Sequence, residues 1–278
     1  MNTAWRRFIV SGIAVAAVLA LGPKHLRAAD ASPALTLDQK EEFLRKAKVM
    51  KEHSVAKGIT DTVRVTLSDG QITHDASVQR IDEHKTVFRP DNGPPEFNFK
   101  DTYASNIAGW KLARLLGLDD MVPPSVARGY EGKSAAFTWW IDDVMMDGVE
   151  KLNKKAEPPN LNDWNKELNV MYVFDQLIYN TDRNQTNVLI DKQWRLWMID
   201  HTRAFRVNRN LLDPKVLSGC DRTLLIKLKG LDEATLKTRL VPYVSPDEIR
   251  ALLARRDLIV KVFDAKGESA LFDRPSRH

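Results

Sequence analysis

The residues most able to carry out chemistry lie in one stretch, FDQLIYNTDRNQTNVLIDKQWRLWMIDHTRAF, residues 174–205. Asp182 follows a predicted helix and opens a loop, and Asn187 lies five residues later, just before an apolar strand. Asp200 ends the next apolar strand, Leu196 to Ile199. A path of helix, loop, strand, turn and strand would bring these three polar side chains to one edge of the fold.

A carboxylate, an amide and a second carboxylate in this order suit phosphoryl transfer. A carboxylate can accept the proton of an attacking hydroxyl, and the cations on a triphosphate prefer oxygen ligands. In protein kinases the catalytic-loop Asp and Asn stand five residues apart, and a later Asp holds metal. We therefore expect Asp182 to act as the base, and Asn187 and Asp200 to hold Mg or Mn. Arg183, beside the expected base, could orient the loop or contact a phosphate.

Each of these residues, taken singly, also has a simpler interpretation. An Asp-Arg pair is often a surface ion pair, an Asn before a strand is often a turn residue, and Asp200 could cap a following turn. The joint pattern favours the chemical interpretation, because separation, predicted local structure and order all agree.

The stretch resembles the atypical kinases: the HipA family, the secretory-pathway kinases related to four-jointed, and the phosphoinositide 3-/4-kinases. Their N-x-D-R-x-x-x-N loop and following I-D-x motif match residues 180–187 and 199–201. SNIAGWKLARLLGLDDMVPPSVAR, residues 105–128, is similar to the small-lobe helix and following strand of the HipA and four-jointed groups. The resemblance covers about residues 60–205. The resemblance implies that ATP binds between two lobes. It also implies Asp182 as the catalytic base and Asn187 and Asp200 as metal ligands.

At several positions that the resemblance assigns to the nucleotide site, this sequence departs from the families or allows more than one interpretation. The families hold the nucleotide phosphates with a small-lobe lysine, but matching VFRP places Arg89 there, with Lys85 nearby as a substitute. Arg89 is either a phosphate ligand or a surface residue, and its planar fork differs from an ammonium group. Asn106 stands where an acid is often found. Asp69-Gly70 is the nearest candidate for a phosphate loop, although a lone Asp-Gly is usually a turn. Trp140, at the expected hinge, could wall an adenine pocket or pack in the core.

Hydrophobic patterning predicts the elements that must position these residues. In the first half we expect a helix from Thr36 to about His53, a hairpin over 62–81, a short strand at 87–88, a helix over about 102–116 and extended runs over 125–130 and 134–141. In the second half we expect a polar loop over 144–160, a helix over about 163–179, strands over 187–191 and 195–199, and helices starting near Asp213, Asp232 and Ser245.

This pattern predicts an α+β, two-lobed protein-kinase-like (atypical kinase) fold. A small antiparallel-sheet N-lobe with one main helix would precede a mainly helical C-lobe. The predicted parts are a signal peptide at 1–31, an N-terminal helical extension at 32–57, the N-lobe at 58–143 and the C-lobe at 144–278.

The first 31 residues have the three-part layout of a secretory signal peptide. Two arginines precede an apolar run, Phe8 to Leu21, which is shorter than the roughly 20 residues of a membrane span. Small residues at Ala29 and Ala31 offer a cleavage site. We expect an exported protein, periplasmic or secreted, with no stable membrane span after leader cleavage; the alternative is an uncleaved anchor.

Composition excludes several other classes of protein. Without the leader, 38 basic and 36 acidic residues remain, and no basic stripe with aromatics supports a nucleic-acid partner. Cys220 is the single cysteine, so no internal disulfide forms, and we expect a buried apolar thiol. No G-x-S-x-G motif supports an acyl-transfer hydrolase.

Two hypotheses from different classes follow. The first is an exported phosphotransferase that uses ATP and Mg or Mn; its acceptor could be a protein, a lipid or a small molecule, and nucleotidyl transfer is also open. The second is a catalytically impaired pseudokinase that acts as a binding or scaffold protein in the cell envelope. Arg89, Asn106 and the export signal motivate the second, because ATP is scarce outside the cytoplasm.

Overall fold

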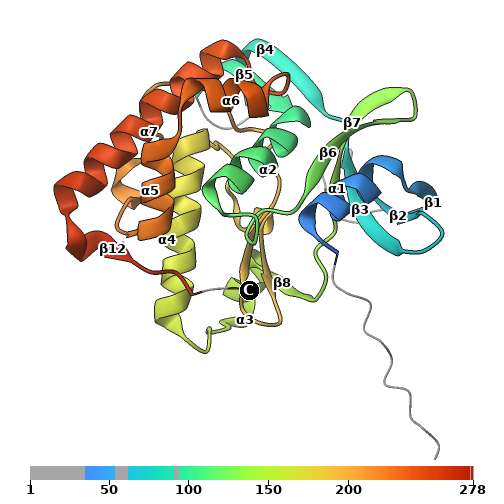
Figure 1. The fold of residues 1–278 in the computed structure, drawn as a ribbon, viewed down its shortest axis with the longest axis horizontal. Helices are drawn as coiled ribbons and strands as arrows, with labels where there is room; N and C mark the ends of the chain where they lie inside the picture. Colours follow the sequence, from blue (N-terminus) through green and yellow to red (C-terminus); the bar gives the residue numbers. More distant parts are fainter. Residues whose placement is uncertain (1–34, 54–61, 91–93, 276, 278) are drawn as a thin grey trace, which may run out of the picture. The chain divides into compact units, whose positions relative to one another are not determined.

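The computed structural model describes residues 35–53, 62–90, 94–275 and 277, all within the unit Leu35–His278 (Figure 1). The predicted signal peptide, 1–31, therefore lies outside the described residues. Among the helices described, none combines the length and apolar character that crossing a membrane requires.

The N-terminal part of the chain is built on a five-stranded antiparallel sheet. Its strands, in spatial order, are β1 (Lys48–His53), β2 (Val63–Ser68), β3 (Thr73–Gln79), β7 (Lys133–Trp139) and β6 (Ser125–Tyr130). The predicted hairpin turn at Asp69 and Gly70 is confirmed. Gly70 has φ +92°, and the Asp69 carboxylate accepts hydrogen bonds from the backbone N–H groups of Gln71 and Ile72.

Helix α1 (Leu37–Lys46) packs on this sheet. Thr36 and Gln39 form the predicted capping box. The helix ends at Lys46 and Ala47 is extended, so the predicted continuation to His53 is wrong. Residues 48–53 pair with β2 instead, because the edge of the sheet supplies partners for their backbone hydrogen-bonding groups.

A second antiparallel pair, β4 (Asp82–Phe88) and β5 (Glu96–Thr102), stands apart from the five-stranded sheet. Two contacts tie β5 to the C-terminal half of the chain. The backbone N–H of Thr102 donates to the carbonyl of Thr202 at 3.0 Å, and Lys100 forms a buried ion pair of 2.7 Å with Glu248. The base of this hairpin is therefore fixed against the segment that follows Asp200.

Helix α2 (Ala104–Leu116) and α4 (Leu161–Ile178) confirm the two long helices that the sequence predicts, and Gly117 caps α2 at φ +70°. Residues 144–160, predicted as a loop, instead contain β8 (Val144–Asp147) and α3 (Gly148–Lys154). Asp147 and Glu150 form a capping box that starts α3, a signal that the prediction missed. Strand β8 joins β9 (Val188–Asp191) and β10 (Leu196–Met198) in a three-stranded sheet.

The C-terminal part is mainly helical. Its elements are the 3-10 turn η2 (Pro214–Val216), strand β11 (Cys220–Asp221), helices α5 (Arg222–Gly230), α6 (Glu233–Leu240) and α7 (Pro246–Lys266), turn η3 (Glu268–Ala270) and strand β12 (Leu271–Phe272). Asp232 and Ser245 cap α6 and α7 as predicted, whereas Asp213 starts only a single 3-10 turn. Helix α5 was not predicted.

Two separate hydrophobic clusters support these two parts of the chain. One joins α1 to the five-stranded sheet, through Phe43, Leu44, Leu67, Val78 and Phe137 among others. The other joins α2, α4, β9, β10 and the C-terminal helices. The predicted α+β class, with an antiparallel sheet first and a helical part second, is confirmed.

Candidate functional site

The loop that follows α4 is fixed by side chains of the helix and of the loop itself. Helix α4 ends at Ile178, and its C-cap residue Tyr179 is left-handed at φ +52°. The amide nitrogen of Asn180 donates to the Asp175 carboxylate at 3.0 Å, and its amide oxygen accepts from the backbone N–H of Asp182 at 3.1 Å. Asn180 therefore sets the backbone position from which the Asp182 side chain emerges.

Arg183 links this loop to both segments that carry the predicted cation ligands. Its guanidinium contacts the two carboxylate oxygens of Asp175 at 2.9 and 3.1 Å. Its Nη1 also donates to the backbone carbonyls of Asn187 and Ile199, each at 2.7 Å. The side chains of Arg183 and Asp175 are both more than nine-tenths buried. Of the two roles that the sequence left open for Arg183, these contacts correspond to orienting the loop.

Asn187 lies beside both Asp182 and the segment that leads from β10 to Asp200. It closes the 3-10 turn η1 (Gln185–Asn187) and is buried. Its amide nitrogen donates to the carbonyl of Asp182 at 3.0 Å, and its own carbonyl accepts from the backbone N–H of Ile199 at 3.2 Å. Since the nitrogen is engaged in this way, the amide oxygen is the atom left for a ligand.

Asp200, two residues after the end of β10, adopts a left-handed conformation with φ +53°. One oxygen of its carboxylate, Oδ1, accepts a hydrogen bond of 2.9 Å from the hydroxyl of Thr202. Within the described part of the chain, the other oxygen has no hydrogen-bond partner. Asp182 and Asp200 are both half-buried, so each carboxylate is partly open to solvent. The structure therefore brings Asp182, Arg183, Asn187 and Asp200 together.

A third carboxyl group, which the sequence did not indicate, belongs to the same place. Asp101 lies in β5, and the pKa of its carboxyl is raised chiefly by burial and further by the negative charges of Asp200 and Asp182. A hydrogen bond from Thr202 and the charge of Arg203 act in the opposite direction. Asp101 was missed because β5 was not predicted and no neighbouring motif marked the residue.

His201 is enclosed by the protein and is only 2% exposed. Burial, followed by the charge of Arg183, lowers the pKa of His201 well below its usual value, so the imidazole is neutral. Its ring packs edge-on against Phe174 and against Gly109 of α2. A group enclosed in this way does not reach a substrate.

Asn106 on α2 connects the five-stranded sheet to the segment around Asp200. Its amide oxygen accepts a hydrogen bond of 2.7 Å from the backbone N–H of His201, and its amide nitrogen donates to the side-chain oxygen of Gln79 at the end of β3. Both amides are buried. Asn106 therefore braces the site rather than pairing with a cation.

The other predicted nucleotide-binding residues are not brought to this place. Arg89 follows β4 and is exposed. Glu83, six residues earlier, pairs across the hairpin with Asp101, so Arg89 lies about 20 Å along the strands from that end. Lys85, also exposed, pairs with Glu83 at 2.7 Å. Trp140 is half-buried and carries the Arg64 guanidinium over its ring at 4.3 Å.

The described residues fit a cation that is shared with a ligand. No group of three or more His, Cys, Asp or Glu side chains in the described part of the chain could hold a metal ion alone. Asn187 and Asp200 instead offer one amide oxygen and one carboxylate. Mg²⁺ is usually held in this way, by one or two carboxylates together with phosphate oxygens and water.

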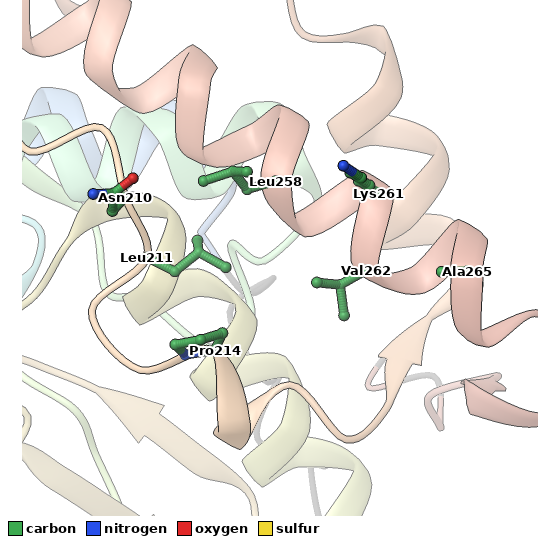
Figure 2. Close-up of a pocket in the computed structure, with 7 residues that line it drawn as sticks. All are labelled: Asn210, Leu211, Pro214, Leu258, Lys261, Val262 and Ala265. Carbon is green, nitrogen blue, oxygen red and sulfur yellow. The ribbon is translucent and has the colours of Figure 1, made fainter.

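A pocket elsewhere on the molecule shares none of these residues. It has a volume of about 450 Å³ and lies between α7 and the chain before η2, lined by Asn210, Leu211, Pro214, Leu258, Lys261, Val262 and Ala265 (Figure 2). Apolar side chains form most of its lining, beside Asn210 and Lys261, and it contains none of the carboxylates of the loop site.

Comparisons with known proteins find solved structures with a similar fold. No family model matches the chain, and no curated protein matches it. The crystal structure of the Helicobacter pylori proinflammatory kinase CtkA is similar over 78% of this chain and 93% of that chain, with 13% sequence identity and a TM-score of 0.48. At this level of likeness, no property of that protein is carried over to this chain.

Proposed function

We propose that the protein is an exported phosphotransferase that uses ATP and a divalent cation, Mg or Mn. One observation carries the proposal: Arg183 holds the backbones of Asn187 and Ile199 together, so the loop of Asp182 and the strand end of Asp200 meet. Carboxylate and amide oxygens at such a meeting point suit a cation-bound triphosphate.

In this function, the residues of the loop take separate roles. Asp182 would accept the proton of the attacking hydroxyl, and its partial exposure leaves room for an acceptor. Asn187 and Asp200 would hold the cation, whose charge stabilises the transferring phosphoryl group. Arg183, Asp175 and Asn180 would keep the loop in place, and Asn106 would hold the backbone of His201, next to Asp200.

The acceptor remains open among proteins, lipids and small molecules, and so does transfer of the nucleotidyl group. Export rests on the leader alone. Its test is the N-terminal sequence of the protein recovered from the envelope or medium of its own cells. A start shortly after Ala31 supports export, and an intact leader on cytoplasmic protein contradicts it.

The reaction is tested with ATP labelled at the γ-phosphate and, separately, at the α-phosphate, in the presence of Mg²⁺ or Mn²⁺. Label is followed on the protein itself, on water and on added acceptors. Asp182→Asn should lower the rate about 100-fold or more, because it removes the proton acceptor. The control is Asp143→Asn, which changes a surface carboxylate paired with Lys192. Equal rates for Asp182→Asn and the parent would contradict the assignment.

The position of Arg89 favours a second candidate, a pseudokinase that binds nucleotide without transferring it. Arg89 and Lys85, the two predicted phosphate ligands, are exposed on the β4–β5 hairpin, and Lys85 is paired with Glu83. Calorimetry with ATP and Mn²⁺ separates the candidates. Metal-dependent binding without turnover would favour the pseudokinase, whereas turnover that depends on Asp182 favours the enzyme.

A further inference from the structure

Asp101 is a carboxylate that the structure encloses without giving it a full set of partners. The residue is only 7% exposed, and its Oδ1 has no hydrogen-bond partner in the described part of the chain. An ionised group in this situation is unfavourable unless a cation or hydrogen bonds compensate it. Neighbouring cations do so only in part, because Arg203 is itself paired with Glu96.

The position of Asp101 is set by contacts of its two neighbours in the chain rather than by its own side chain. The next residue, Thr102, donates its N–H to the carbonyl of Thr202 at 3.0 Å. Lys100, on the other side, is anchored to Glu248. Asp101 is thus held at the edge of the hairpin that faces the segment after Asp200.

Thr202 connects the two carboxyl groups. Its hydroxyl donates to Asp200 Oδ1 at 2.9 Å and, as a nearby polar group, also lowers the pKa of the Asp101 carboxyl. A proton engaged with Asp200 cannot fully compensate a second carboxylate. The negative charges of Asp200 and Asp182 both act on Asp101, so these three carboxyl groups share one region.

We propose that Asp101 is a further ligand for a divalent cation of the Mg²⁺ or Mn²⁺ type, which it would share with Asp200. This inference rests on the proposed function, since it adds a residue to that site. The orphaned oxygen of Asp101 and the free oxygen of Asp200 supply two hard ligands, and water or phosphate completes the set. A ligand from β5 would make cation binding depend on the β4–β5 hairpin as well as on the loop after α4.

The test uses Mn²⁺ alone as the probe, with free Mn²⁺ counted by electron paramagnetic resonance in a titration of the whole protein. Asp101→Asn should weaken Mn²⁺ binding about tenfold or more, because one anionic ligand is lost. Glu83→Gln removes an exposed negative charge from the same end of the hairpin, and it should bind Mn²⁺ within about twofold of the parent. Asp101→Glu, which keeps the carboxylate, should bind more tightly than Asp101→Asn.

Thermal unfolding without metal provides a second readout. Asp101→Asn should unfold at the same or a higher temperature than the parent, because it removes an uncompensated buried charge. Adding Mn²⁺ should raise the unfolding temperature of the parent more than that of this variant. A variant that is unfolded without metal would overturn the inference, since the carboxylate would then serve the structure itself.

Equal Mn²⁺ affinity in Asp101→Asn and the parent, or no saturable Mn²⁺ binding by the parent, would also overturn it. These results are distinct from a failure of the proposed function. If Mn²⁺ binding depends on Asp101 but no label leaves ATP, the inference stands and the phosphotransferase fails. If label is transferred but Mn²⁺ affinity is the same in Asp101→Asn and the parent, the phosphotransferase stands and the inference about Asp101 fails.

Discussion

Asp175 and Arg183 form a buried two-point ion pair that joins α4 to the loop carrying Asp182. The guanidinium also holds the carbonyls of Asn187 and Ile199, so one side chain spans three segments. Replacing Arg183 by Ala should lower the free energy of unfolding by about 3–5 kcal/mol, because Asp175 is left buried and unpaired. The urea-unfolding curve measures this change.

The matched control is Lys192→Ala, which breaks the exposed pair with Asp143 and should leave the urea midpoint unchanged. A midpoint for Arg183→Ala that also equals that of the parent would show that the buried pair does not hold the loop.

Asn106 should act through its two hydrogen bonds rather than through charge. Asn106→Ala leaves the N–H of His201 and the side-chain oxygen of Gln79 buried without partners. We expect a loss of about 2 kcal/mol or more in the free energy of unfolding. Asn106→Asp should cost less, since it still accepts from His201 and the Gln79 amide can turn to donate to it. Equal losses in the two variants would contradict this account.

The Lys100–Glu248 pair should stabilise the base of the β4–β5 hairpin. Both side chains are about nine-tenths buried, and their charged atoms are 2.7 Å apart. Glu248→Gln keeps a side chain that can cap α7 but leaves Lys100 without a counter-charge, so we expect a loss of about 3–5 kcal/mol. Asp264→Asn breaks the exposed pair with Lys229 and serves as the control. A Glu248→Gln protein as stable as this control would exclude the pair as an anchor.

Cys220 should be chemically silent in the folded protein. Burial, with a smaller effect of Asp221, raises the pKa of its thiol to about 12. The folded state therefore keeps the thiol proton at alkaline pH, and stability should fall as pH rises above the ordinary thiol pKa of about 9. A thiol-reactive disulfide reagent at pH 8 should label Cys220 only after denaturation. Rapid labelling of native protein would show that the thiol is accessible.

The loop of the candidate site could be predicted because its signal is local. Asp182 follows a helix, Asn187 ends a turn and Asp200 follows a hairpin, and the helix and the hairpin strands each have a clear apolar pattern. Capping signals at Thr36 and Ser245 were also read correctly, since a cap depends on residues three positions apart.

What the sequence did not show depends on tertiary contacts. Residues 48–53 continue a helical pattern, yet they pair with β2 once the sheet offers its edge. Asp101 comes to Asp200 only because β5 is anchored through Thr202 and Glu248, far along the chain. Asn106 stands where the related families often have an acid, and the sequence does not show that its amide bonds Gln79 and the backbone of His201.

Crystals of the protein with Mn²⁺ and a non-hydrolysable ATP analogue test the central claim most directly, through the anomalous signal of the metal. We predict a Mn²⁺ peak within about 2.0–2.6 Å of both the Asp200 carboxylate and the Asn187 amide oxygen, with phosphate oxygens completing the shell. A nucleotide bound at another surface, or a metal peak that touches neither residue, would contradict the account.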